Sequence, residues 1–293
     1  MTEEQCNPFP YTPIRYEFPF PKIKAKCVLA SIGSCFSDDL AGLLLHSGMH
    51  GAKNPNGIVY HPLSICDSLM RLSCGYMPDD FFEFNGLWHS WSHHGSFSSR
   101  TREEILDKAN ESAKRFLKAL KKADVFLMTC STSVVFRHIP SRRIVANCHK
   151  VPGNEFDRFI LPYSACKAAI LTSCRHVREL NPHCIIILTL SPVRHHPGNL
   201  TLNARSKAQL LSAIHEVCEM VSGTTYFPAW EILNDELRDY RFYAEDMLHP
   251  SPVAFRIILE RFLDSCFVPQ AKQDFLMAEA RRKAVAHIPL QME

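Results

Sequence analysis

The sequence lacks the features that mark several large classes of protein. It has no uninterrupted apolar run near the roughly 18 residues that a membrane-spanning helix needs. Its first residues, MTEEQCNPFPYTPIRY, do not follow the basic and then apolar order of a secretory signal. Because 33 basic residues face 30 acidic ones, the net charge of +3 is too balanced to indicate nucleic acid or an anionic membrane as a partner. We therefore expect no membrane span and no nucleic-acid partner.

The sequence also lacks C-x-x-C pairs, although it contains 12 cysteines. This absence argues against a zinc ribbon and against a dithiol redox motif. Several cysteines lie inside apolar runs such as ILTSC and HCIIILTL, where a free thiol packs like a small apolar group. We expect reduced, mostly buried cysteines and a cytoplasmic location. The pair His93-His94 has no acidic residue or cysteine at ligand spacing, so we expect neither a metal nor another cofactor.

The apolar content of 46% is enough for a sizeable core, and the length suits one domain over residues 1–293. A Pro-rich and aromatic arm over 1–25 and a charged helical tail over 269–293 flank it. Buried strands are expected at 26–33, 123–129, 184–190 and 224–228, with a short strand that runs into a turn at 50–57. Helices are expected at 37–47, 62–73, 101–122, 163–180, 203–222 and 252–267. A hairpin is expected over 133–147, while 79–99 shows no clear period.

Strands that are apolar on both faces and alternate with helices predict a parallel sheet covered on two sides, a three-layer α/β/α fold. In such sheets ligands bind at the carboxyl ends of the strands. Polar clusters follow the predicted strands at that edge: GSC, NPNG, TCST and SPVRH. We therefore look for a site among these clusters.

Gly33-Ser34-Cys35 lies where the first predicted strand passes into a helix. A thiol there is exposed by the turn, and we expect the helix N-terminus to lower its pKa. A simpler interpretation is that Ser34 caps the helix while Cys35 packs inward. Near the other end of the chain, Asp246 and His249 are three residues apart, a spacing that lets the carboxylate hold one tautomer of the imidazole. A surface acid beside a helix-start histidine is the simpler alternative there.

Other polar residues are candidates for binding. Gly57, in NPNG, can offer its N–H as an oxyanion donor, or it can be an ordinary turn glycine. Arg194 can hold a carboxylate or phosphate, or it can form a structural ion pair. Asn203, Arg205 and Lys207 head a helix, where they contact an anion or form its solvated first turn. The predicted substrate-binding residues are Asn56, Trp88, His89, His149, Arg194 and His195, the aromatic ones being equally compatible with a loop packed on the domain.

Six ordered blocks of the sequence resemble one family. The blocks SIGSCFS, NPNGIVYHPLS, GLWHSWSHHGSFS, VANCHK, SPVRH and RFYAEDMLHPSPVA, spread over about residues 12–268, look like the GSCFA family, with Ser37 in place of the family's alanine. That family is similar to the SGNH/GDSL hydrolases, which implies a flavodoxin-like fold and metal-free hydrolysis or transfer of an acyl group.

The resemblance implies roles for individual residues. Asp246 and His249 match the D-x-x-H pair of those hydrolases, and Gly57 matches their second block. A gapless match of I-G-D-S puts Cys35 in the nucleophile position, with Ser34 as the alternative. No asparagine lies at the expected place in the third block, so Asn147 or Thr132 is the expected third oxyanion donor.

The combined expectation is an acyl hydrolase or transferase that acts on a small-molecule or carbohydrate acyl ester. One rival is a non-catalytic module that binds an acylated or anionic small molecule on the same fold. A dinucleotide-binding protein is disfavoured because no G-x-G-x-x-G turn follows the first strand.

Overall fold

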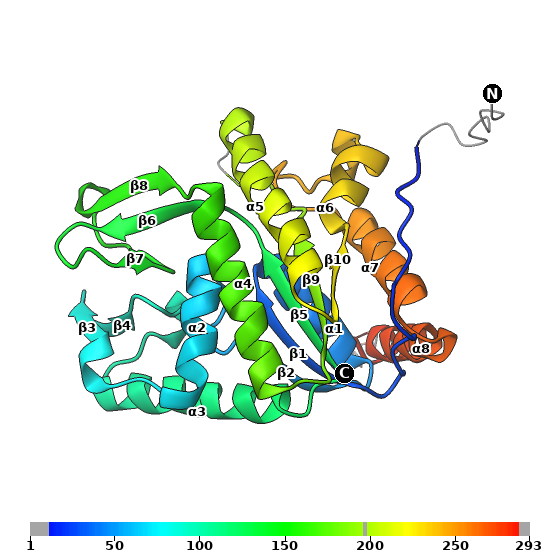
Figure 1. The fold of residues 1–293 in the computed structure, drawn as a ribbon. Helices are drawn as coiled ribbons and strands as arrows, with labels where there is room; N and C mark the ends of the chain where they lie inside the picture. The colour runs from blue at the N-terminus through cyan, green and yellow to red at the C-terminus, as the bar shows by residue number, and fades with distance from the viewer. Residues whose placement is uncertain (1–11, 196–197, 287–293) are drawn as a thin grey trace, which may run out of the picture.

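The centre of the molecule is a five-stranded parallel sheet (Figure 1). The computed structural model describes residues 12–195 and 198–286; residues 1–11 of the predicted arm and 287–293 of the predicted tail lie outside these ranges. The strands are β1 (Val28–Gly33), β2 (His50–Lys53), β5 (Val125–Cys130), β9 (Ile185–Leu190) and β10 (Thr224–Phe227). Their spatial order is β10-β9-β5-β1-β2. Numbered along the chain this is the 2-1-3-4-5 order of flavodoxin-like sheets, which confirms the predicted fold class.

Helices cover both faces of the sheet. One layer contains α2 (Pro62–Cys74), α3 (Arg102–Leu120), α4 (Tyr163–Leu180) and α5 (Leu200–Met220). The other contains α1 (Cys35–His46), α7 (Pro252–Cys266) and α8 (Pro269–Ala286), with the short α6 (Ala229–Glu231) and a π-helical turn, Ile232–Leu237, beside them.

Strand β5 shows why two layers are needed. Its residues are all buried, and they alternate between the two cores: Phe126 and Met128 face the α3–α5 layer, whereas Val125 and Leu127 face the α1–α7 layer. Successive strand residues point to opposite faces, so a continuously apolar strand requires cover on both. In the described part of the chain no helix combines the length and the apolarity that crossing a bilayer requires.

Two small antiparallel sheets lie beside the main one, at the left in Figure 1. The first pairs β3 (Phe81–Phe84) with β4 (Leu87–Ser90), and the second has the order β7-β6-β8, with β6 (Val134–His138), β7 (Ile144–Val145) and β8 (Phe156–Ile160). We call residues 78–100 and 133–161 together the extension. The β6–β7 hairpin was predicted from its alternation; β3, β4 and β8 were not, because aromatic and polar residues mask their period.

The described part of the N-terminal arm, residues 12–27, is tied to the α1–α7 layer. Residues 12–27 form little regular structure, but Ile23 pairs with Phe267 in an isolated bridge just beyond α7. The N–H of Ile14 donates to the carboxylate of Glu236, which also pairs with Arg261 of α7. These contacts fix the segment that leads from β10 to α7, and that segment carries Asp246 and His249.

Candidate active site

Cys35, the first residue of α1, lies beside His249 at the carboxyl edge of the sheet. Its Sγ is 3.6 Å from Nε2 of His249. The other ring nitrogen, Nδ1, is 2.6 Å from Oδ2 of Asp246. One imidazole therefore joins a thiol near the start of the chain to a carboxylate near its end.

The turn before α7 holds His249 in this orientation. The second carboxylate oxygen of Asp246 accepts the backbone N–H groups of Leu248 and His249, at 2.9 and 3.0 Å. Together with the bond from the imidazole, these N–H groups lower the pKa of Asp246 to about 2, the backbone N–H of His249 having the largest effect. The ionised carboxylate of Asp246 accepts a hydrogen bond from the Nδ1–H group. This bond selects the tautomer in which Nε2 carries a lone pair, and that lone pair faces the thiol.

Two further contacts anchor that turn. The N–H of Ala244 donates to the carbonyl of His249 at 2.8 Å, and the N–H of Arg194, which follows β9, donates to the carbonyl of Leu248 at 2.9 Å. Ser251 caps α7 by accepting the N–H of Ala254. The histidine is thus fixed against both the sheet edge and a helix start, although its side chain is 48% exposed.

Ser34, the alternative nucleophile, is placed differently. It is the residue before α1, it is fully buried, and its hydroxyl has no hydrogen-bond partner. The expected N-cap bond from Ser34 is also missing. The neighbouring Ser37, which replaces the family's alanine, instead bonds to the hydroxyl of Ser31 at 2.9 Å.

The pKa of the Cys35 thiol is raised, which corrects the expectation of a lowered value. Burial is the main cause; the nearby carboxylate of Asp39 adds to it, while the backbone N–H of Phe36 acts in the opposite direction. The N–H groups of the first turn of α1 do face the sulfur, but desolvation outweighs them. The resting group is therefore a thiol that needs a base.

Gly57 is not a free oxyanion donor. Its N–H donates to the carbonyl of Asn54 at 2.9 Å, closing a tight turn. The need for glycine is conformational: φ is +74°, and an added Cβ would lie 2.6 Å from the Cβ of His94. This corrects the oxyanion role expected for Gly57.

Of the two expected third donors, Thr132 is committed elsewhere. The N–H of Thr132 donates to the carbonyl of Tyr60, and its hydroxyl contacts Ser206 at 3.0 Å. Asn147 lies in a turn of the extension, where its Oδ1 accepts the N–H of His149. That bond does not use the side-chain N–H groups of Asn147, which are the groups that would donate to an oxyanion.

His195, a predicted substrate-binding residue, follows β9 at the carboxyl edge of the sheet. Its Nε2 is 2.5 Å from the hydroxyl of Ser131, which follows β5, and its backbone N–H donates to Asn203. Its ring meets the edge of Tyr60 at 5.5 Å, and the charge of Cys35 helps to raise the pKa of Tyr60 after burial. His195, Ser131 and Tyr60 therefore form one contact cluster at this edge.

Arg194 forms the rim beside His249. Its guanidinium stacks on Tyr243 at 3.8 Å and approaches Tyr240 at 5.3 Å. Among the described residues it forms no ion pair with a carboxylate, so the expected structural ion pair is replaced by a cation–π contact.

The remaining predicted substrate residues make contacts within or against the extension. Trp88 stacks under Arg102, and His89 is bonded to Ser98 and to a backbone carbonyl. His149 is buried with Nε2 on the carbonyl of Ser90, and the amide of Asn56, which precedes the extension, is bonded to Tyr76. The contacts of Trp88 and His89 agree with the alternative of a loop packed on the domain.

The start of α5 is a part of the site that sequence reasoning misjudged. Asn203, Ser206 and Lys207 are buried and bind the loops after β5 and β9, whereas Arg205 is exposed. The expected solvated first turn is thus wrong for Asn203 and Lys207 and holds for Arg205. A sign was present in the sequence, because these polar residues recur at i, i+3 and i+4, on one helix face.

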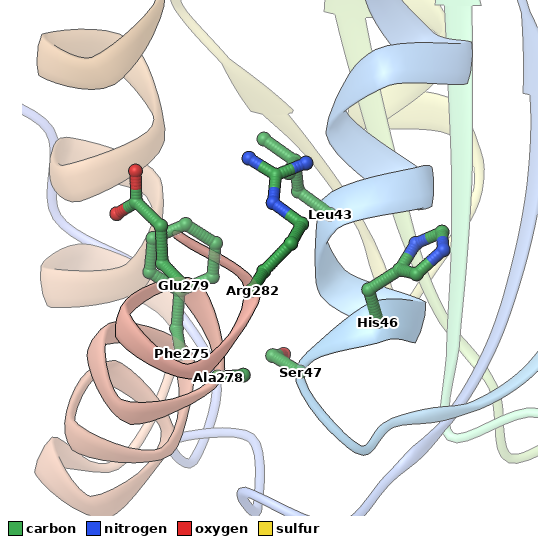
Figure 2. Close-up of a pocket in the computed structure, with 7 residues that line it drawn as sticks. All are labelled: Leu43, His46, Ser47, Phe275, Ala278, Glu279 and Arg282. Atoms are coloured by element: carbon green, nitrogen blue, oxygen red, sulfur yellow. The ribbon is translucent and has the colours of Figure 1, made fainter. Parts of the chain in front are cut away.

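A groove of about 370 Å³ begins one helical turn from Cys35, at Asp39, and follows α1 to His46. A smaller pocket of about 110 Å³ lies between the end of α1 and α8 and contains none of the predicted catalytic residues (Figure 2). Among the described residues no group of three histidine, cysteine or acidic side chains is arranged to hold a metal ion.

The model of the GSCFA family matches residues 28–262. No curated protein matches the chain. Solved structures with similar folds include a variant of an acetylxylan esterase from Geobacillus stearothermophilus (12% identity, 85% of this chain and 98% of that one, TM-score 0.45). A protein described as a GDSL-like lipase from Parabacteroides merdae (11%, 84% and 99%, 0.45) and a family 3 carbohydrate esterase from Clostridium thermocellum (8%, 82% and 94%, 0.38) are similar too. The match over residues 28–262 covers most of the sequence, and the chain therefore belongs to the GSCFA family.

Proposed function

We propose that this protein is an acyl hydrolase or acyltransferase with Cys35 as its nucleophile, His249 as its base and Asp246 as the residue that orients the base. The observation that carries this proposal is the line of contacts from Sγ through the imidazole to the carboxylate, at 3.6 and 2.6 Å. The substrate is an ester or thioester of a small molecule or a carbohydrate. A cytoplasmic setting, expected from the sequence, would keep the thiol reduced.

The first step is acyl transfer to sulfur. Nε2 of His249 takes the thiol proton as Sγ attacks the carbonyl carbon, and the imidazolium is stabilised by Asp246. The imidazolium then gives its proton to the leaving alcohol or thiol, which departs as the carbonyl re-forms. The product is an acyl-thioester on Cys35.

The second step releases the acyl group. Water, or an acceptor alcohol or thiol, loses its proton to Nε2 while it attacks the thioester carbonyl. The proton returns to Sγ as the carbon–sulfur bond breaks. The exposed position of His249 gives an acceptor access to the base from the solvent side.

The oxyanion needs donors in place of Gly57 and Thr132. The first-turn N–H groups of α1 have no acceptor within the helix, and those of Cys35 and Phe36 face the sulfur. Donors at a helix N-terminus suit developing negative charge. Ser131 and His195, which follow β5 and β9, are the side-chain candidates.

Turnover of p-nitrophenyl acetate and of an acetyl thioester tests the assignment. We expect Cys35→Ala to lower kcat/KM by about 10³-fold or more. Ser34→Ala should leave it within about threefold and should not lower the melting temperature, because it deletes a buried hydroxyl that has no partner. Cys74→Ala, at an exposed cysteine on α2, is the matched control.

Two outcomes would overturn the proposal. If Ser34→Ala abolishes turnover while Cys35→Ala retains it, the nucleophile is the serine. If wild-type protein binds an acylated sugar but does not turn over either ester class, the rival binding module is favoured.

A further inference from the structure

Lys207 is buried in the interior although no carboxylate pairs with it. It lies on α5 and is only 1% exposed. Its Nζ donates to two backbone carbonyls, those of Ser131 and Ser191, each at 2.7 Å. Among the described residues it has no ion pair. An ammonium group in such a place is costly, so its retention calls for a physical reason.

The two carbonyls belong to neighbouring strand ends. Ser131 directly follows β5 and Ser191 directly follows β9, so one amine joins the two loops at the carboxyl edge of the sheet. The hydroxyl of the same Ser131 bonds to Nε2 of His195. Lys207 thus helps to hold Ser131 and, through it, His195.

The same amine acts on the nucleophile through its charge. The positive charge of Lys207 lowers the pKa of Cys35, although burial raises it more. Conversely, burial lowers the pKa of Lys207 to about 7, while negative charge on Cys130 or Cys35 raises it. Burial keeps Cys130 of β5 protonated, which leaves Cys35 as the anion that Lys207 meets.

The other titratable groups near these loops are His195 and Tyr60. His195 follows β9 and is bonded to Ser131, and Tyr60, from the loop between β2 and α2, contacts the His195 ring. Each can alter the local field, so a test must follow the Cys35 sulfur itself and not activity alone.

We infer that Lys207 is a positioning residue of the reaction: it clamps the loops after β5 and β9, and its ammonium charge stabilises the anion that forms at Cys35 and on the substrate carbonyl. This role rests on the function proposed above. The ammonium group gains a full negative partner when the thiol proton leaves, and it needs no movement to do so, because its two carbonyl bonds already hold it.

The test is the pH dependence of Cys35 alkylation by iodoacetamide, followed by mass spectrometry of the peptide that contains Cys35. Lys207→Gln retains hydrogen-bond donors for the carbonyls and loses the charge; Lys207→Met loses both. Because burial lowers the pKa of Lys207 to about 7, its charge acts mainly below that pH, so we expect both variants to lower the labelling rate at pH 6.5 by about threefold or more and to leave the rate above pH 9 within about twofold of wild type. Arg205→Met, which removes an exposed charge two residues away, should leave the profile unchanged.

A variant that folds, loses thermal stability and keeps the wild-type labelling profile would show a merely structural lysine and overturn the inference. Should neither variant fold, the reciprocal measurement decides: alkylation of Cys35 in the wild-type protein by iodoacetate, which places a carboxylate at the sulfur, is expected to raise the titration midpoint of Lys207, observed by NMR of its side chain, above the midpoint after alkylation by the neutral iodoacetamide. Equal midpoints contradict the coupling. Labelling requires no ester. A protein without turnover would therefore count against the proposed hydrolase but not against the effect of Lys207 on Cys35.

Discussion

The carboxyl edge of the main sheet and the extension are both rich in histidine, yet they use it in opposite ways. At the edge, His249 is about half exposed and lies between a thiol and a carboxylate. In the extension and at its contact with α2, His61, His93 and His149 are buried. Burial lowers the pKa of these three to about 4, 3 and 4.

The difference distinguishes a histidine that can take up and release a proton from histidines whose hydrogen bonds stabilise the fold. A buried imidazole stays neutral and links backbone groups: His61 caps α2 and reaches the carbonyl of Val145 in β7. An exposed imidazole with an ionised neighbour can accept a proton and be reset by solvent. Residue type alone does not distinguish the two uses, but the partners do.

Replacing one histidine of each kind should have the largest effects, on turnover in one case and on melting temperature in the other. His249→Gln is expected to lower turnover by about 10³- to 10⁴-fold with little change in melting temperature, because the exposed base is lost without a cavity. His61→Gln should do the reverse, lowering the melting temperature while turnover per folded molecule stays close to wild type. Ester hydrolysis and thermal unfolding measure the two effects, and equal turnover in wild type and His249→Gln would break the comparison.

Lowering the pH should reduce the stability of the extension before it reduces the stability of the carboxyl edge of the main sheet. The three buried histidines have folded-state pKa values below the ordinary value near 6.5, so between pH 6.5 and about 4 the unfolded chain binds more protons than the folded one. Their stabilising contribution is complete above pH 6.5 and is lost as the pH falls toward 4, by about 3 kcal/mol in sum near pH 5.5.

Hydrogen exchange at pH 7.5 and 5.5, corrected for intrinsic rates, measures this loss. Protection should fall in β4, β6 and β7 more than in β5 and β9. His93→Phe, which cannot bind a proton, should reduce the pH dependence of that protection. Equal loss across both regions would show that the buried histidines do not control it.

The smallest effect is expected where the sequence predicted a sugar-binding wall. Trp88→Leu should change KM for an acetylated xylo-oligosaccharide by less than about twofold, and lose at most about 1 kcal/mol of stability with the stack on Arg102. Arg194→Met, at the edge, should raise KM by about threefold or more for an anionic ester. A larger effect of Trp88→Leu would place substrate on the extension after all.

The fold was predictable because its strands are continuous apolar runs and its helices carry clear caps. CIIILTL and ADVFLMT could only be buried strands, and Thr101 begins α3 as expected by accepting the N–H of Glu104. The Cys35, Asp246 and His249 candidates were found because strand-end motifs converge in a parallel sheet.

What the sequence could not predict depends on competition between close alternatives. Whether the N–H of Gly57 is free depends on the turn closing onto the carbonyl of Asn54, which the residue types NPNG do not decide. The pKa of Cys35 depends on the balance between burial, which raises it, and the helix N–H groups, which lower it. The sequence does not specify that balance. Lys207 looks like a solvated residue until the loops after β5 and β9 are seen to surround it.

The raised pKa of Cys35 has a consequence for durability. Peroxides attack a sulfur that has lost its proton far faster than one that keeps it. A Cys35 thiol that keeps its proton is thereby shielded from oxidation to sulfenic acid. In the proposed mechanism the sulfur loses its proton only while it attacks a bound ester, so the time spent as a vulnerable anion is short.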